Sequence, residues 1–235
     1  MNYGDTERQV FRTFLAFASL ILILILLFFN ISTDIYRVSS IVYDTSIDLT
    51  LNTDSIENLK GNSIWLIDDA YFETFYQENP SVERISIQKE LPSTLLIQID
   101  ISERIAFIDD NRQTPPRSFI LYKNLYTRDT NTNEGLTSIN INNGPVNEGF
   151  FGEVITFVLT LKKYPINLSN IVFDYDGTSV NVTHFNSEFF LGDPSDLARK
   201  AAVVGYYISE EPCEGEIRVV YGEDGKEITA VTKCQ

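Results

Sequence analysis

The chain has 235 residues, of which 33 are acidic and 18 basic, so its formal net charge at pH 7 is −15. No basic patch is available to displace phosphate counterions, so we expect no nucleic-acid binding and no charge-driven docking on anionic lipid headgroups. About 200 residues follow the apolar N-terminal segment, enough for one large domain or two small ones.

An apolar segment near the N-terminus predicts one transmembrane helix over residues 13–33. No charged residue stands between Arg12 and Asp34, and about twenty helical residues span the roughly 30 Å of a hydrocarbon core. The alternative is a cleaved signal peptide. The apolar segment exceeds the usual 7 to 15 residues of such a peptide, and its exit at Asn30–Thr33 lacks a small-x-small cleavage site, so we expect an uncleaved anchor.

The distribution of basic residues around this segment favours one orientation. Arg8 and Arg12 precede it, whereas Arg37 is the only basic residue between it and Lys60. Positive charge concentrates on the cytoplasmic side of a membrane helix. We therefore expect residues 1–12 to form a short cytoplasmic tail in a single-pass protein of the cell membrane, with the bulk of the chain outside the cytoplasm.

Residues 34–108 are predicted to form a small α+β domain. Its expected elements are a strand at Tyr36–Tyr43, a helix opened by a capping box at Asp54 and Glu57, a helix N-capped at Asp68 or Asp69, and two strands before and after Leu91–Ser93. The second of these strands alternates most clearly, with Leu95, Ile97, Ile99 and Ile101 on one face. The predicted order is strand, helix, helix, strand, strand, with both helices on one face of the sheet.

Residues 109–235 are predicted to form a second, antiparallel β-rich domain with two helices. The polar stretch from Asp109 to Arg117 is interpreted as a boundary or a long hairpin loop. Helical stripes are expected from Phe151 to Leu161 and after Asp193, which is interpreted as an N-cap with Pro194 in the first turn. Expected strands surround the Asp176–Gly177 turn and close the chain as a hairpin.

The two cysteines, Cys213 and Cys234, belong to this closing hairpin. A four-residue loop over 222–225 would place Tyr221 opposite Lys226 and Cys213 opposite Cys234. Ile217, Val219, Ile228 and Ala230 would then share the apolar face. We expect a cross-strand disulfide, and a pair of reduced thiols is the alternative.

Motifs that would carry catalysis or bind a cofactor are not found in the sequence. The single histidine, His184, stands in a strand pattern without zinc-ligand or triad spacing. Asp174, Asp176 and Gly177 match only the start of a calcium loop, because Phe185 occupies the position of its last ligand. We therefore expect no enzyme activity, no catalytic or metal site, no cofactor and no small-molecule substrate.

The segment from Tyr36 to Ile108 resembles the POTRA domain of the bacterial FtsQ/DivIB cell division family. The strand ending at Glu103–Arg104 carries the most specific similarity, and Phe190–Gly192 before a helix that contains Lys200 resembles the second domain of the family. The further residues that carry the resemblance are Tyr36, Val38, Ile41, Tyr43, Gly61–Asp68, Asn79, Pro80, Val82, Leu91, Pro92, Thr94, Leu95, Ile97 and Ile99.

This resemblance implies a non-enzymatic, membrane-anchored scaffold of the division septum. Its partners would be other single-pass division proteins of the FtsB/DivIC and FtsL type, and it would help to regulate septal cell-wall synthesis. An exposed sheet edge can add a partner strand, and we place the candidate partner site on the last strand and its neighbours: Tyr207, Tyr221, Ile228, Ala230 and Thr232. The main alternative is an extracytoplasmic sensor or ligand-binding module; an anchored extracellular enzyme is a further one.

Overall fold

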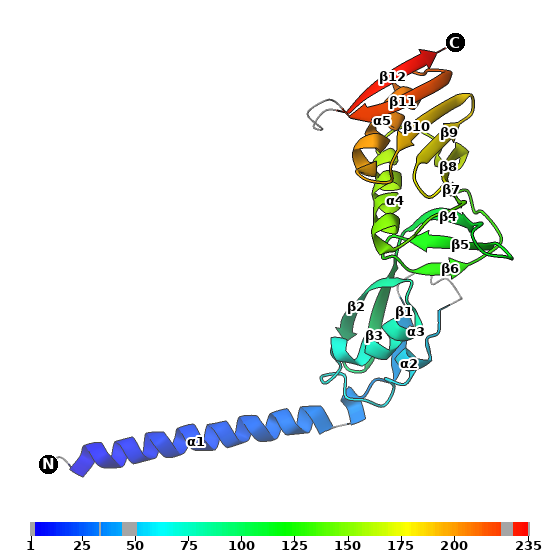
Figure 1. Ribbon diagram of the computed structural model, residues 1–235. Helices are drawn as coiled ribbons and strands as arrows, with labels where there is room; N and C mark the ends of the chain where they lie inside the picture. The colour runs from blue at the N-terminus through cyan, green and yellow to red at the C-terminus, as the bar shows by residue number, and fades with distance from the viewer. Residues whose placement is uncertain (1–2, 33, 44–50, 222–227, 235) are drawn as a thin grey trace. The chain divides into compact units, whose positions relative to one another are not determined.

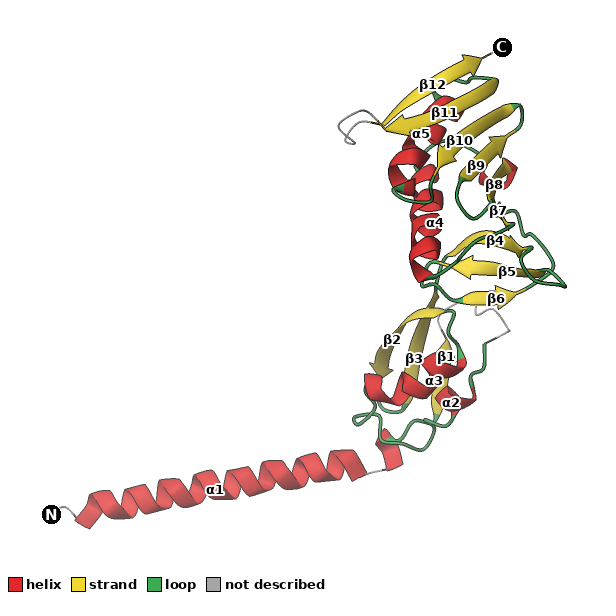
Figure 2. Cartoon of the chain, viewed as in Figure 1, coloured by secondary structure: helices red, strands yellow, loops and turns green. Residues whose placement is uncertain are grey.

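The computed structural model describes residues 3–32, 34–43, 51–221 and 228–234 (Figure 1). The chain is a mixed α+β protein and divides into two compact units, Met1–Ile101 and Ser102–Gln235. The helices and strands of each unit are distinguished by colour in Figure 2.

The first helix, α1 (Tyr3–Ser32), contains the predicted apolar segment. Its stretch Phe11–Phe28 is long and apolar enough to cross a membrane, and none of it is buried within the protein. A continuous run of exposed Leu, Ile and Phe side chains is unfavourable in water. The helix therefore has the length and composition of a membrane span.

The rest of the first unit contains a three-stranded sheet in the order β1-β3-β2. Strand β3 (Thr94–Ile101) lies in the centre, parallel to β1 (Ser40–Tyr43) and antiparallel to β2 (Val82–Glu90). The alternation seen in the sequence places Leu95, Ile97 and Ile99 in the core. Ile101, expected on the same face, is instead exposed at the end of the strand.

Short helical elements complete the core of this unit: η1 (Asp34–Tyr36), α2 (Asp54–Glu57), η2 (Asp69–Phe72) and α3 (Glu73–Glu78). Asp68 N-caps η2 by accepting a hydrogen bond from the backbone N–H of Ala70, as expected. The predicted capping box of α2 is wrong, because Thr53 is the N-cap residue and its side chain makes no capping bond. Phe72 and Phe75 are fully buried with the sheet residues.

The second unit is built on a nine-stranded sheet in the order β12-β11-β10-β9-β8-β7-β4-β5-β6. Its strands are β4 (Arg104–Asp110), β5 (Arg117–Tyr122), β6 (Thr127–Asp129), β7 (Thr137–Ile141), β8 (Ile171–Tyr175), β9 (Val180–His184), β10 (Ser187–Gly192), β11 (Gly215–Tyr221) and β12 (Ile228–Cys234). Its helices are α4 (Glu148–Leu161), η3 (Leu168–Asn170) and α5 (Leu197–Ser209).

This sheet is mixed, which corrects the antiparallel expectation. Strand β7 is parallel to both β4 and β8, and β10 is parallel to β11. Neighbouring parallel strands need a crossover connection, and α4 supplies it between β7 and β8 while α5 supplies it between β10 and β11. The two helices that the sequence predicted therefore account for two of the three parallel pairs, whereas the chain passes from β4 to β7 through β5 and β6.

Both long helices pack on one face of the sheet, and they contact each other. The apolar stripe of α4, including Val154, Val158 and Leu161, is buried against strand residues such as Phe173. The opposite face is more polar, with Asn140 donating a hydrogen bond to Asp174 across β7 and β8. A small cluster of Phe107, Ile120 and Tyr122 covers that face near β4 and β5.

The second unit begins earlier in the chain than expected. Residues 104–110 form β4 in the interior of the nine-stranded sheet, whereas the first domain was expected to extend to residue 108. Ala106 and Ile108 are buried in the large core and Phe107 in the small cluster on the other face, which fixes this strand in the second unit. The polar stretch after it is the turn of the β4–β5 hairpin.

Gly205 on α5 lies close to the ring of Tyr164 and yields a prediction. A Cβ at this position would lie 2.7 Å from Cγ of Tyr164, so Gly205→Ala should destabilise the second unit by about 1–3 kcal/mol. The matched control is Gly152→Ala on α4, where a Cβ meets nothing within 4 Å. Urea unfolding of the full chain, followed by hydrogen exchange of α4 and α5, should separate the variants; equal stabilities would contradict the close packing.

Candidate functional site

The last strand of the chain, β12, lies at one end of the nine-stranded sheet. Within the described residues it pairs with β11 alone, over seven positions from Gly215↔Cys234 to Tyr221↔Ile228. Alternate backbone N–H and C=O groups of an edge strand point away from the sheet and can pair with another chain. This edge, together with its support from β11 and α5, is the candidate functional site.

The opposite edge of the same sheet is far less suited to strand addition. Strand β6 has only three residues, and ion pairs surround it: Asp129 with Arg117, and Arg128 with Glu134. Short edge strands and edge charges are two devices that prevent edge pairing. The longer β12 has Lys233 as its only charged residue, so it is the more open edge of this unit.

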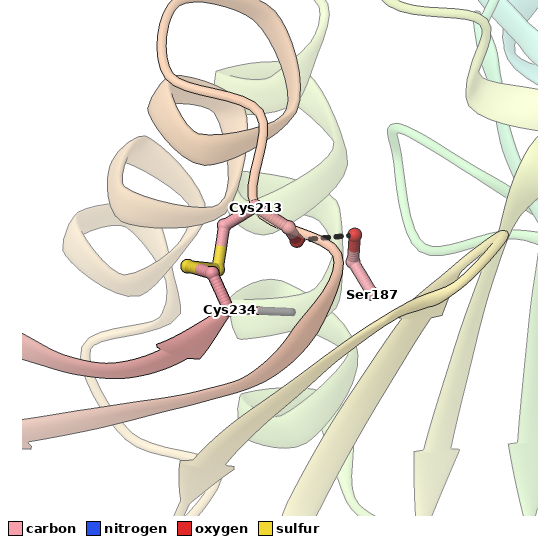
Figure 3. Close-up of a disulfide and its surroundings, with 3 residues drawn as sticks. All are labelled: Ser187, Cys213 and Cys234. Atoms are coloured by element: carbon pink, nitrogen blue, oxygen red, sulfur yellow. Dashed lines mark hydrogen bonds between the residues drawn. A yellow bond between two sulfur atoms is a disulfide. The ribbon is translucent and has the colours of Figure 1, made fainter.

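A disulfide joins Cys213 to Cys234 and fixes the end of β12 (Figure 3). The Cα atoms are 5.2 Å apart, which lies within the usual span for such a bond. Cys213 is buried, and its carbonyl oxygen accepts a hydrogen bond of 2.8 Å from the Ser187 hydroxyl on β10. Closing a loop of this size reduces the conformational entropy of the unfolded chain, which stabilises the folded state by on the order of 3 kcal/mol.

The register of this hairpin differs from the expected one by two residues. Tyr221 pairs with Ile228 instead of Lys226, and Cys234 pairs with Gly215 instead of Cys213. Cys213 therefore lies two residues before β11 and reaches Cys234 diagonally. The predicted loop over 222–225 falls outside the described residues. A shift of two keeps each residue on its face, which explains why Ile217 and Val219 are nevertheless buried.

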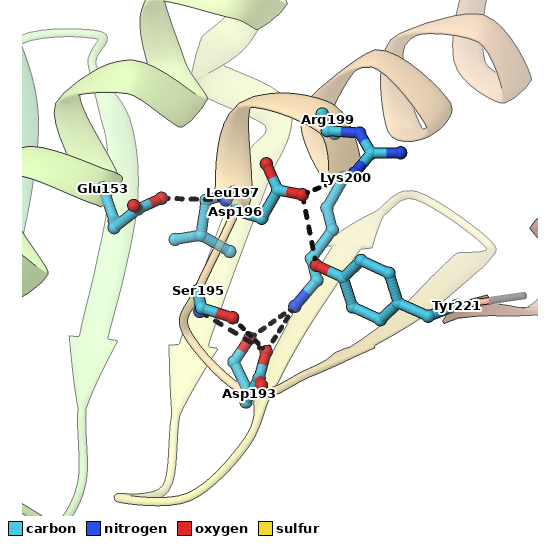
Figure 4. A network of polar contacts seen from close by, with 8 residues as sticks. All are labelled: Glu153, Asp193, Ser195, Asp196, Leu197, Arg199, Lys200 and Tyr221. Carbon is cyan, nitrogen blue, oxygen red and sulfur yellow. Dashed lines mark hydrogen bonds and ion pairs between the residues drawn. The ribbon is translucent and has the colours of Figure 1, made fainter. Parts of the chain in front are cut away.

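Behind the hairpin, a buried lysine connects β11 to the turn before α5 (Figure 4). The Lys200 side chain is 1% exposed, and its Nζ donates to the backbone oxygen and to Oδ1 of Asp193, both at 2.7 Å. The same Nζ lies 5.4 Å from the ring centroid of Tyr221. Backbone oxygen, carboxylate and ring face together stabilise the charge of Lys200 away from water.

The turn before α5 is arranged around this lysine, which corrects the predicted start of the helix. Helix α5 begins at Leu197 with Asp196 as its N-cap residue in the left-handed conformation, φ 53°. The Asp196 side chain makes no capping hydrogen bond. The N–H of Leu197 donates to the carboxylate of Glu153 on α4, at 2.8 Å. Asp193 was the expected cap, but its carboxylate accepts from Lys200 and Ser195.

The ionisation of these side chains reflects the same contacts. The hydrogen bond from Lys200 is the main cause that holds the pKa of Asp193 below its ordinary value. Burial, followed by the nearby charge of Asp196, raises the pKa of Tyr221. The Tyr221 hydroxyl lies 3.4 Å from Oδ2 of Asp196. At neutral pH Asp193 is therefore a carboxylate and Tyr221 is uncharged.

The structure brings the predicted site residues together in two groups. Tyr207 and Ala230 are half-buried and pack against the main core, so they support the hairpin from its inner face. Tyr221 and Thr232 are exposed, the first at 39%. Ile228 pairs with Tyr221 through the backbone, and its side chain lies outside the described residues.

Other residues of the site were not predicted from the sequence. On the outer face of the hairpin, Val220 and Val231 are 41% and 55% exposed. Arg218, paired with Val231, lies over the ring of Phe190 at 4.9 Å. Period-two alternation in β11 and β12 would have identified the two valines, whereas nothing in the sequence indicated the burial of Lys200.

The remaining candidate chemistry is limited in the part of the chain that the structure describes. No three His, Cys, Asp or Glu residues gather there in a group that could hold a metal ion. Burial lowers the pKa of His184, which lies at the end of β9 with its ring against Phe185. Asp176 accepts four hydrogen bonds from Thr178 and Ser179, as expected for a turn aspartate.

The sequence matches no model of a known protein family and no curated protein. A function for this chain is therefore inferred from the geometry of the β12 edge and from the residues that support it.

The Lys200–Asp193 contact yields a prediction about pH. Because the folded pKa of Asp193 lies below its ordinary value of about 3.9, the contact stabilises the fold above that pH and is lost as the pH falls through the folded pKa. In the Lys200→Met variant the pH midpoint at which the Asp193 carboxyl titrates should rise toward the ordinary value. Carboxyl ¹³C shifts of the full chain measure this midpoint. Asp176 is the internal control, because its low pKa comes from Ser179 and Thr178. An unchanged Asp193 midpoint would contradict the assigned cause.

Proposed function

We propose that this chain is a membrane-anchored scaffold whose edge strand β12 captures an extended segment of a partner protein. The observation that carries the proposal is a seven-residue edge strand that, among the described residues, pairs on one side only and is fixed by a disulfide at its end. Strand addition uses main-chain hydrogen bonds for affinity and side-chain contacts for specificity. Thr232 on the edge and Val231 on the outer face are exposed and available for such contacts.

A rigid edge favours this mode of binding. An ordered strand that is already extended loses less conformational entropy when a partner pairs with it than a mobile segment would. The disulfide restrains one end of β12, and Lys200 contacts Tyr221 at the last residue of β11. These two restraints act at opposite ends of the terminal hairpin formed by β11 and β12.

The scaffold that we propose is of the FtsQ/DivIB type, at the division septum. Three features support it: an N-terminal apolar helix, a first unit with the element order expected of a POTRA domain, and a β-rich second unit. In the second unit, Phe190–Gly192 precede α5, and Lys200 within α5 is fully buried. The proposed partners are single-pass proteins of the FtsB/DivIC and FtsL type, through which the chain would regulate septal wall synthesis.

The proposed arrangement places α1 across the cell membrane with residues 1–12 in the cytoplasm. The part of the first unit that follows α1 and the whole second unit then lie on the extracytoplasmic side, the compartment in which a disulfide persists. The scaffold role assigns no reaction to the chain and requires no cofactor.

A pair of proline variants tests which sheet edge captures the partner. Proline removes a backbone donor and is disfavoured within strand pairs, so Ala230→Pro on β12 should abolish co-purification of the FtsB/DivIC-type partner with the full chain. Ser86→Pro, at an exposed position of β2, one of the two edge strands of the first unit's sheet, is the matched control and should retain the partner. Fluorescence of Trp65 reports that the first unit stays folded in Ala230→Pro.

Two outcomes would contradict the proposal. Normal partner recovery with Ala230→Pro would exclude the β12 edge, and loss of the partner only with Ser86→Pro would assign capture to β2. The septal location is tested separately, because a fluorescent fusion of the intact chain should accumulate at midcell in dividing cells. A diffuse membrane signal in those cells would count against a division scaffold.

A further inference from the structure

Outside α1, several large apolar side chains of the first unit are exposed, and four of them lie in η1 or in turns beside ordered structure. Ile35 is 66% exposed, Trp65 43%, Leu66 55% and Leu91 56%. They come from three separate segments: η1, the turn before η2, and the turn between β2 and β3. We call these four residues the entry cluster.

The strand register brings Leu91 to the end of the sheet where β1 begins. Ser40, the first residue of β1, lies opposite Thr94, and Thr94 also lies opposite Glu90, the last residue of β2. The Ser39 N–H donates to the Ser93 carbonyl oxygen at 2.9 Å. The β2–β3 turn is therefore adjacent to the segment by which the chain enters the sheet from α1.

Trp65 and Ile35 lie at the same end of the sheet. The Ile64 N–H donates to the carbonyl oxygen of Tyr36 at 2.8 Å, and the rings of Tyr36 and Trp65 are 5.7 Å apart. From β2, the Lys89 ammonium donates to the Trp65 carbonyl oxygen at 3.4 Å. Three separate segments thus present apolar side chains where the chain enters this unit.

The covalent connection to α1 limits how far this end can lie from a membrane that α1 crosses. Ile35 follows Ser32, the last residue of α1, by three positions, and three extended residues reach at most about 10 Å. The headgroup region on each side of a bilayer is roughly 5–8 Å thick. Ile35 is therefore restricted to the headgroup region or to the water layer next to it.

The composition of the cluster suits the membrane interface more than a charged lipid surface. Tryptophan is enriched at headgroup depth, where its amphipathic ring is favourable. Two basic side chains near the entry cluster have their charge partly neutralised by ion pairs: Arg37 pairs with Asp34 at 2.8 Å, and Lys60 pairs with Glu57. Binding should therefore depend on apolar insertion and should not require anionic lipid.

We propose that the entry cluster inserts into the interfacial region of the bilayer that α1 crosses. This second contact would restrict the tilt of the part of the first unit that follows α1, because that part gains points of attachment beyond its covalent connection to the helix. The inference rests on the proposed membrane anchoring of α1, and the two can be tested separately.

The test uses Trp65, which is the only tryptophan in the chain. The full chain is reconstituted in phosphatidylcholine vesicles and isolated by flotation, and Trp65 emission is measured with lipids brominated near the headgroup. The reporter control is Trp65→Phe/Val231→Trp, which places the only tryptophan at an exposed position of β12. We expect blue-shifted emission and several-fold stronger lipid quenching for Trp65 than for the control, in neutral and anionic vesicles alike.

A second variant pair tests whether the cluster acts together. Leu66→Ser/Leu91→Ser should weaken lipid quenching of Trp65, whereas Val42→Ser, at a 46% exposed position of β1 outside the cluster, should not. Failure to float would contradict the anchoring itself. A floated chain whose Trp65 resembles the control in emission and in quenching by aqueous acrylamide would overturn interfacial insertion, as would quenching that appears only with anionic lipid.

Discussion

An open β-sheet ends in strands whose outward backbone groups have no partner within the sheet, and this constraint governs the second unit. At one end of the sheet, strand addition is disfavoured because β6 is short and ion pairs surround it. At the other end, β12 is long and nearly uncharged. The rest of the unit stabilises that end: α5 lies behind it, Lys200 contacts its hairpin, and a disulfide closes it.

The stability of this edge comes from contacts that are remote in sequence. Lys200 connects α5, the turn at Asp193 and the ring of Tyr221, so one buried cation fixes three elements at once. Ser187 on β10 binds the carbonyl of Cys213 and fixes the start of the hairpin against the parallel neighbour strand. An edge supported in this way stays extended without a partner, which lowers the entropic cost of capturing one.

Much of the fold was predictable because its elements carry clear periodic patterns. The alternation of Leu95, Ile97 and Ile99 identified β3, and the stripe that includes Val154 and Val158 identified α4. Strand direction and boundaries were not predictable from such patterns. Two of the three parallel pairs of the nine-stranded sheet depend on where α4 and α5 lead the chain back to the sheet, and β4 belongs to the second unit because both of its faces are buried there.

The site was predicted in outline, with errors that have physical causes. Period two fixes the face of a strand but not its register, so the cysteine hairpin was misplaced by two residues while its apolar face was identified. The proposed capture of a partner by β12 is tested most directly by amide hydrogen exchange of β12 in the full chain, with and without an FtsB/DivIC-type partner. Alternate β12 amides should exchange more slowly when the partner is bound, and prior reduction of the disulfide should diminish this effect. Unchanged exchange in β12 upon binding would contradict capture by this strand.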